Sequence, residues 1–329
     1  MDGKKIRYTG RFDFSDPEGP KFAWSASAVS ARFFGTEASV RLKSFGNNYL
    51  LVILDGRVIN KALHVEDEGT FRLAYGLSEV EHEITLVKRT EFYLGTVQFL
   101  GFDFGKGRLL SPPADSNRRI EIIGDSITCG FGNEGSPDME YDPRYDNGWL
   151  SYGVAAARLL TADYMIIGRS GYGIIRDYEG NRSNTLPSVY HLTLPEKSEQ
   201  WDFTRWIPDV VVINLGTNDF SYGYVPERKE FIRAYLDLIH TIRNHYPHTC
   251  IVCTVGPLVD GDALIITQDY VQNGIVGQLV NSSQNWISYL EFPHQKAEDG
   301  YGISMHPSVK THEFMGKRLS DEIRRIKNW

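Results

Sequence analysis

The sequence lacks a long apolar run and any excess of basic residues, and each absence excludes a class of partner. No apolar stretch approaches the roughly 20 residues that a membrane-spanning helix needs, so we expect no membrane partner. The formal net charge of -7 over 329 residues provides no basic surface for phosphate backbones. We therefore expect no nucleic-acid partner either.

Cysteine is also scarce. The 3 cysteines are an odd number, and Cys250 and Cys253 lie in an apolar run where their spacing sends them to opposite faces of a strand. We expect buried free thiols rather than a redox or metal pair. The sequence accordingly predicts no metal site and no cofactor.

The first residues are not followed by the apolar core of a signal peptide. As it stands, the sequence predicts a cytoplasmic protein, or a secreted one if a leader has been removed from it. It predicts no particular oligomeric state.

The length of the chain favours two domains, and its pattern changes between them. Up to about residue 107, short alternating segments are separated by Gly, Asn and Asp turns, which predicts an antiparallel β-sandwich of the jelly-roll kind. The stretch 109–117, with paired prolines, predicts a linker between domains 1–108 and 118–329. Beyond it, strands alternate with helices, which predicts a parallel sheet with helices on both faces.

The candidate nucleophile lies after the first strand of the second domain. A β-branched run from Ile120 breaks at Gly124, which places Asp125 and Ser126 on the following turn. A serine hydroxyl is a poor nucleophile at neutral pH, so it needs a nearby base and donors for the developing oxyanion.

Groups of the right type follow other predicted strands: Gly171, Asn218 and His306. Residues just past the carboxyl ends of parallel strands share one crevice, so we expect these groups to meet there. Each alone equally fits a turn, a helix cap or a packed histidine. Their common placement at strand ends favours a hydrolytic site.

Four segments resemble the sequence blocks of the SGNH, or GDSL, hydrolases: Gly124-Asp-Ser-Ile-Thr128, Gly171, Gly216-Thr-Asn-Asp219 and His306-Pro-Ser308. More closely, residues 119–133, with the all-β domain and the Pro-Pro linker before them, are similar to carbohydrate esterase family 2. That resemblance implies a jelly roll followed by an SGNH-type α/β/α domain. It also implies a serine esterase of the acetylxylan esterase kind, which removes acetyl groups from plant-wall polysaccharides such as xylan and mannan.

By the same resemblance, Ser126 is the nucleophile and His306 the general base. The oxyanion hole is implied to consist of the backbone N–H groups of Ser126 and Gly171 and the side-chain amide of Asn218. Gly173 is the alternative donor if the turn is registered later.

The chain departs from the family where an acid usually stands shortly before the histidine, since it has Ile303 and Ser304 there. A further group must still fix the imidazole tautomer. We expect a backbone carbonyl of residues 302–304 to do so, which gives a Ser-His dyad, and we expect Asp299 not to take part.

Four residues are candidates for contact with sugar: Tyr172, Trp201, Tyr301 and Met305, the last standing where some relatives have an aromatic residue. Such aromatic side chains also serve commonly as core packing. We expect Asp125 to brace its turn and Asp219 either to orient Asn218 or to cap the next segment.

The expected partner is an acetylated oligo- or polysaccharide, cleaved through an acyl-enzyme. Two other functions remain open: a lipase or thioesterase on the same scaffold, and a non-catalytic carbohydrate-binding protein whose jelly roll does the binding.

Overall fold

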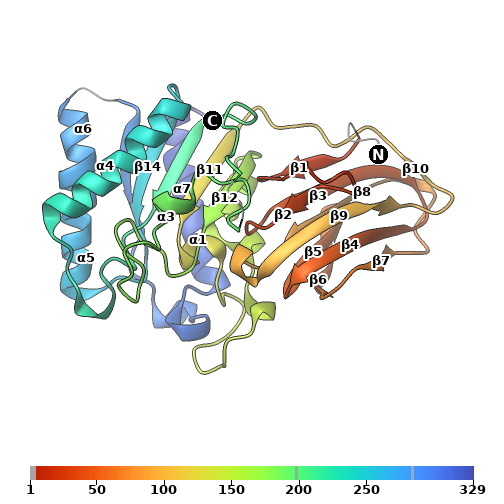
Figure 1. The fold of residues 1–329 in the computed structure, drawn as a ribbon, viewed down its shortest axis with the longest axis horizontal. Helices are drawn as coiled ribbons and strands as arrows, with labels where there is room; N and C mark the ends of the chain where they lie inside the picture. Colours follow the sequence, from red (N-terminus) through yellow and green to blue (C-terminus); the bar gives the residue numbers. More distant parts are fainter. Residues whose placement is uncertain (1–4, 197–198, 283–284) are drawn as a thin grey trace.

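The computed structural model describes residues 5–196, 199–282 and 285–329. The chain forms an all-β part and an α/β part that lie side by side (Figure 1). In the all-β part, one antiparallel sheet has the order β1-β3-β8-β5-β6 with β10 also paired to β3, and the other has the order β2-β9-β4-β7. The strands are β1 (Arg7–Thr9), β2 (Lys21–Phe22), β3 (Ala28–Gly35), β4 (Ala38–Gly46), β5 (Asn48–Leu54), β6 (Arg57–Val65), β7 (Gly69–Ala74), β8 (Val80–Lys88), β9 (Gly95–Asp103) and β10 (Arg108–Leu109).

The two sheets enclose one apolar core. In β3, the alternate residues Val29 and Phe33 point into it, and Leu42 of β4 reaches it from the other sheet. The turn between β5 and β6 is Asp55–Gly56, and both residues have the left-handed backbone that a tight hairpin requires, with φ of 49° and 74°. The predicted sandwich is confirmed.

The second part is built on a parallel sheet with the order β12-β11-β13-β14-β15. Its strands are β11 (Arg119–Gly124), β12 (Asp163–Gly168), β13 (Val210–Asn214), β14 (Cys250–Val255) and β15 (Ile287–Glu291). Successive side chains of a strand point to opposite faces of the sheet, and each face has its own apolar core. Ile213 and Cys253 lie in one core, and Val212 and Val252 lie in the other. The three cysteines are free, and Cys250 packs on the opposite side of the sheet from Cys253, as expected. Cys129 and Cys253 are buried as expected, but Cys250 is only half-buried.

Helices cover both faces of this sheet (Figure 1). The helices are α1 (Ser126–Cys129), α2 (Tyr152–Leu159), α3 (Leu186–Val189), α4 (Arg228–His245), α5 (Gly261–Gln268), the π-helical η5 (Asp269–Gly277), α6 (Gln278–Asn281) and α7 (Val309–Lys327). Short 3-10 turns are η1 (Phe92–Leu94), η2 (Pro143–Tyr145), η3 (Gly148–Leu150), η4 (Ser221–Gly223), η6 (Ala297–Asp299) and η7 (Ile303–Met305). Within the described ranges, none of the helices is both long and apolar enough to cross a membrane.

The helical spacing of the sequence predicts one continuous helix over 263–281 and a last helix that opens at Pro307, and the structure differs at both. Between α5 and α6 the hydrogen bonding is π-helical. The last helix begins after Ser308, whose hydroxyl accepts from the N–H of Thr311 at 3.2 Å, so Pro307 precedes the helix instead of opening it. The predicted fold class, a β-sandwich followed by a parallel α/β domain, is confirmed; the domain bounds stay a prediction.

The two parts are joined through buried contacts. Leu51 and Val87 of the sandwich share a core with Tyr164 and Tyr152 of the α/β part. Trp24 is fully buried and donates its indole N–H to the carbonyl of Thr193 at 2.9 Å. The sandwich is therefore packed into the α/β part rather than tethered beside it.

A buried ion pair also crosses this interface. Arg11 of the sandwich and Glu121 of β11 are both fully buried, with 3.3 Å between Nη2 and Oε1. Arg11 also donates to the carbonyl of Leu192 at 2.8 Å, and its guanidinium lies 5.3 Å from the ring centroid of Trp201. A buried charge is costly without its partner, so each member of the pair depends on the other.

We expect Arg11→Met to destabilise the protein by about 3–5 kcal/mol, because it leaves the Glu121 carboxylate buried without a counter-charge. The double variant Arg11→Met/Glu121→Leu should recover part of that loss, since it removes the stranded charge. Urea denaturation followed by tryptophan fluorescence measures both. If the double variant is no more stable than the single one, the stranded charge is not the cause.

Candidate active site

Ser126 follows the end of β11, an inner strand of the sheet that pairs with β12 on one side and β13 on the other. The strand ends at Gly124, where a Cβ would come within 2.0 Å of the Thr128 hydroxyl, so the tight turn excludes a side chain. Asp125 caps the short helix α1 by accepting from the N–H of Ile127 at 3.0 Å. This bracing of the turn is the role expected of Asp125. It holds the Ser126 hydroxyl at the edge of the sheet.

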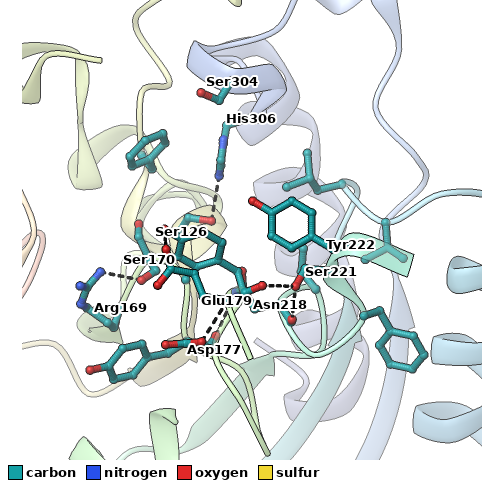
Figure 2. A pocket seen from close by; sticks show the side chains of 18 of the residues that line it. Ser126, Arg169, Ser170, Asp177, Glu179, Asn218, Ser221, Tyr222, Ser304 and His306 are labelled. Carbon is teal, nitrogen blue, oxygen red and sulfur yellow. Dashed lines mark hydrogen bonds between the residues drawn. The ribbon is translucent and has the colours of Figure 1, made fainter. Parts of the chain in front are cut away.

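His306 meets Ser126 across 180 residues of sequence. Its Nε2 lies 2.9 Å from the Ser126 hydroxyl oxygen. Figure 2 marks this hydrogen bond with a dashed line. Its Nδ1 lies 3.1 Å from the carbonyl oxygen of Ile303. A carbonyl only accepts, so Nδ1 must carry the proton, and Nε2 is left free to accept from the serine hydroxyl. The structure thus brings the two predicted partners together.

The turn before His306 brings the Ile303 carbonyl to the ring. Ser304 and Met305 both have left-handed backbones, with φ of 51° and 64°. This is an uncommon conformation for residues other than glycine. It folds the chain back so that the Ile303 carbonyl accepts from the backbone N–H of His306 as well, at 3.1 Å.

Asp299 is engaged elsewhere. Its carboxylate pairs with Lys310 at 2.7 Å, and its carbonyl accepts from the Ser308 hydroxyl at 2.7 Å. The acid that stands a few residues before the histidine in the sequence therefore contributes to the start of α7 and does not orient the imidazole.

Burial makes His306 a weakly basic imidazole. Desolvation lowers its pKa to about 4, and hydrogen bonding of the ring to the backbone of Ile303 and Ser304, which accepts, opposes that shift without cancelling it. The ring of Phe131 covers it, with the two ring centroids 4.6 Å apart. His306 is therefore neutral at rest across the neutral and mildly acidic range.

The other predicted donors lie on two loops beside Ser126. Gly171 lines the same cleft and has φ of 83°, which glycine adopts readily. The Nδ2 of Asn218 donates to the Tyr172 carbonyl at 3.0 Å and, at 3.3 Å, to Asp125. Gly173, the alternative to Gly171, donates its N–H to the Arg176 carbonyl at 3.0 Å.

Asp219 secures the loop that carries Gly171. Its buried carboxylate accepts from the backbone N–H groups of Ile174, at 2.9 Å, and Ile175, at 2.8 Å. Burial raises the pKa of Asp219 to about 6 against these hydrogen bonds, which lower it. Asp219 thus braces the neighbouring loop, a role that the sequence does not predict.

A cleft of about 1010 Å³ opens over Ser126 and His306. Its walls combine aromatic and polar side chains, several of which Figure 2 draws around the serine. They include Arg169, Tyr172, Tyr178, Glu179, Asn184 and Tyr222. This combination of rings and hydrogen-bonding groups is suited to a polar ligand that also presents flat apolar faces.

Of the four candidates for sugar contact, one lines the cleft and three do not. Tyr172 lines the cleft. Trp201 is 6% exposed and packs on Arg11 at the domain interface. Tyr301 is bridged to Pro307 beneath the histidine turn, and Met305 is exposed while its carbonyl accepts from Gln295. Strand and turn positions in the sequence do not reveal which way these side chains face.

The sequence pattern does not predict several of the residues that line the cleft. Arg169 and Ser170 stand in the turn already marked by Gly171, so proximity to that glycine could have pointed to them. Tyr93 comes from η1 of the sandwich and also lines the cleft. Nothing in the local sequence signals that a residue of the first domain reaches the site of the second.

Two family models match the chain. The carbohydrate esterase 2 N-terminal model matches residues 8–113, and the GDSL-like lipase/acylhydrolase model matches residues 122–314. The chain is 44% identical over 329 residues to the cellulase/esterase CelE of Acetivibrio thermocellus. The match spans all of this chain but only 40% of the length of CelE. It is also 27% identical over 328 residues to an acetylxylan esterase/glucomannan deacetylase of Cellvibrio japonicus, covering 98% of the chain and 89% of that protein.

Solved structures agree with this placement. A family two carbohydrate esterase from Clostridium thermocellum, in complex with cellohexaose, superposes with a TM-score of 0.96 at 44% identity, covering 98% of this chain and 99% of that one. A family two carbohydrate esterase from Cellvibrio japonicus gives a TM-score of 0.89 at 26% identity, covering 99% and 96%. The predicted family is confirmed: the chain belongs to carbohydrate esterase family 2, a family of carboxylic ester hydrolases.

Proposed function

We propose that this protein is an O-acetyl esterase that removes acetyl groups from acetylated plant-wall oligo- and polysaccharides, such as xylan and mannan, through a Ser126-His306 dyad. The observation that carries the proposal is the 2.9 Å contact between His306 Nε2 and the Ser126 hydroxyl at the base of the cleft. Family membership and the names of two relatives, acetylxylan esterase/glucomannan deacetylase, support the acetylated substrate.

The first half of the reaction forms an acyl-enzyme. The Ser126 oxygen attacks the acetyl carbonyl carbon while His306 Nε2 takes the serine proton. The bond from the acetyl carbon to the sugar oxygen then breaks, and Nε2 returns the proton to that oxygen. During this step the imidazolium keeps its Nδ1–H on the Ile303 carbonyl, whose partial negative charge stabilises it without a carboxylate.

The negative charge on the carbonyl oxygen of the substrate needs donors. The backbone N–H groups of Ser126 and Gly171 are two, and the Asn218 amide is the third. Asn218 keeps its shorter hydrogen bond to Tyr172, and the oxyanion replaces the longer one to Asp125. Fixed neutral donors of this kind lower the barrier by a few kcal/mol each.

The second half repeats the chemistry with water. Water attacks the acetyl-serine while His306 accepts one of its protons, and acetic acid leaves as that proton passes back to Ser126; the acid then ionises to acetate in solution. The substrate class fits the tyrosines and polar groups of the cleft. A relative 44% identical to this chain was solved in complex with cellohexaose, which supports a carbohydrate ligand for this protein.

We expect Ser126→Ala to lower kcat for release of acetate from acetylated xylan and mannan oligosaccharides by about 10⁴-fold or more, since it removes the nucleophile. His306→Ala should cause a loss of similar size. Acetate release, with the acetylated positions followed by NMR, measures the effect and identifies the hydroxyl that is cleaved. Retained turnover in Ser126→Ala would overturn the assignment of the nucleophile.

A wild-type protein that binds these oligosaccharides but releases no acetate would instead support the non-catalytic alternative. Isothermal titration with Ser126→Ala provides the matched binding measurement, because that variant keeps the cleft and loses the nucleophilic hydroxyl alone.

We expect p-nitrophenyl acetate to be hydrolysed with a kcat/KM at least about tenfold above that of the octanoate ester. Charged and polar groups such as Arg169 and Glu179 line the cleft, and a long alkyl chain laid against them would strip them of water. The reverse preference would favour a lipase or thioesterase.

The loss of activity at acidic pH should follow the pKa of His306. The base must be neutral, and its pKa is lowered to about 4, so kcat/KM for p-nitrophenyl acetate should fall steeply as the pH drops through about 4. A smaller step near pH 6 would belong to Asp219, whose carboxylate braces the loop and whose pKa is raised to about 6. Reassay at neutral pH separates these changes from unfolding. A tenfold loss per pH unit that already begins at 6.5, the ordinary value for histidine, would contradict the lowered pKa of His306.

A further inference from the structure

The loop that supplies the Gly171 N–H is held from the first domain. Ser170 and Gly171 share one peptide unit, whose carbonyl oxygen accepts from the Arg169 guanidinium at 2.6 Å, a contact drawn in Figure 2. The carbonyl and N–H of a trans peptide point in opposite directions. Fixing the carbonyl on Arg169 therefore fixes the direction in which the Gly171 N–H points.

The Arg169 side chain rests on the sandwich. Its guanidinium lies 4.0 Å from the ring centroid of Tyr93 and 5.6 Å from that of Phe92. A cation over an aromatic face is attracted to it, and more strongly where water is excluded. The residue that orients the peptide carbonyl is itself placed by η1 of the first domain.

Glu91 holds the preceding peptide unit, which joins Arg169 to Ser170. The Oε2 of Glu91 accepts from the backbone N–H of Ser170 at 2.7 Å, and its Oε1 accepts from the Ser170 hydroxyl. Glu91 is 0% exposed, so these hydrogen bonds form away from water, where they are stronger. Burial raises the pKa of Glu91, whereas the Ser170 donors and the positive charge of Arg169 lower it.

Glu91 has little freedom to move. The Nζ of the fully buried Lys88 donates hydrogen bonds to the carbonyl of Thr90, at 2.8 Å, and to that of Glu91, at 2.9 Å. The next residue, Phe92, packs edge-on against Trp24 with 5.2 Å between ring centroids. The carboxylate is therefore presented by a rigid corner of the sandwich.

We propose that Glu91 is a positioning residue for the oxyanion hole: through Ser170, and with Tyr93 acting through Arg169, the sandwich domain sets the Gly171 N–H toward the substrate carbonyl. Asp219 anchors the far side of the same loop through Ile174 and Ile175. The loop is thus clamped at both ends, once from each domain. This inference rests on the proposed function, since it assigns Glu91 to the geometry of that reaction.

The chemistry explains why the clamp affects rate rather than substrate binding. A donor to the oxyanion acts most strongly in the transition state, where charge develops, so a small displacement lowers kcat and leaves KM nearly unchanged. Glu91 itself is fully buried and is not among the residues that line the cleft. Its removal should therefore not mimic the loss of a sugar-binding group.

We expect Glu91→Ala to lower kcat for p-nitrophenyl acetate by about 10- to 100-fold with KM changed by less than about twofold, because the Gly171 donor loses its support. Glu91→Gln, which keeps the shape and one acceptor, should give a smaller loss in the same parameter. Should Glu91→Ala fail to fold, Glu91→Gln decides the question.

Glu121→Gln is the matched control. Glu121 is an equally buried carboxylate that also bridges the two domains, but it pairs with Arg11 away from the loop. Its substitution should lower the melting temperature and leave the kcat of the folded protein unchanged. If Glu91→Gln and Glu91→Ala keep the wild-type kcat, or lose activity only in proportion to lost folded protein as Glu121→Gln does, the positioning role is overturned.

The wild type and Ser126→Ala separate this result from the proposed function. If wild-type protein hydrolyses the acetate ester and Ser126→Ala does not, the esterase assignment stands whatever the Glu91 variants do. Unchanged kcat in those variants then counts against Glu91 alone.

Discussion

The hydrogen bond from the Nδ1–H of His306 to the Ile303 carbonyl is the interaction on which the rest of the site depends. It selects the tautomer whose Nε2 accepts from Ser126, and it does so without a carboxylate. The carbonyl reaches the ring because Ser304 and Met305 hold left-handed backbones in the turn. A strained main-chain turn therefore takes the place of a third side chain in the proposed dyad.

A main-chain partner has an electrostatic consequence. A carboxylate beside the ring would raise the pKa of His306, whereas burial against Phe131, opposed by carbonyl dipoles alone, lowers it to about 4. The base is weaker but neutral over a wider pH range. The buried carboxylates nearby, Asp125 and Asp219, serve instead to brace the loops that surround the serine.

The sandwich is part of the same construction. Its core continues into that of the α/β part, Arg11 is paired with Glu121 inside the interface, and Tyr93 lines the cleft. In the proposed reaction, Glu91 extends this to the oxyanion loop through Ser170. Two domains that differ in fold thus contribute to one site. The buried contacts between the domains keep their contributions in place relative to each other.

Periodicity and turn chemistry are local properties, so the sequence by itself determined the two sheet types, most of their strands and helices, and the strand-end positions of Ser126, Gly171 and Asn218. It also placed His306 shortly before the last helix, although the structure puts this histidine after η6 and η7 and not at the end of β15. The sequence also limited the partner of His306 to a short stretch of backbone. Only the tertiary structure decided that Ile303 is that partner, that Trp201 is buried at the interface, and that Glu91 reaches Ser170. The physical reason is that these contacts depend on loop paths and on the packing of one domain against the other, which leave no periodic trace along the chain.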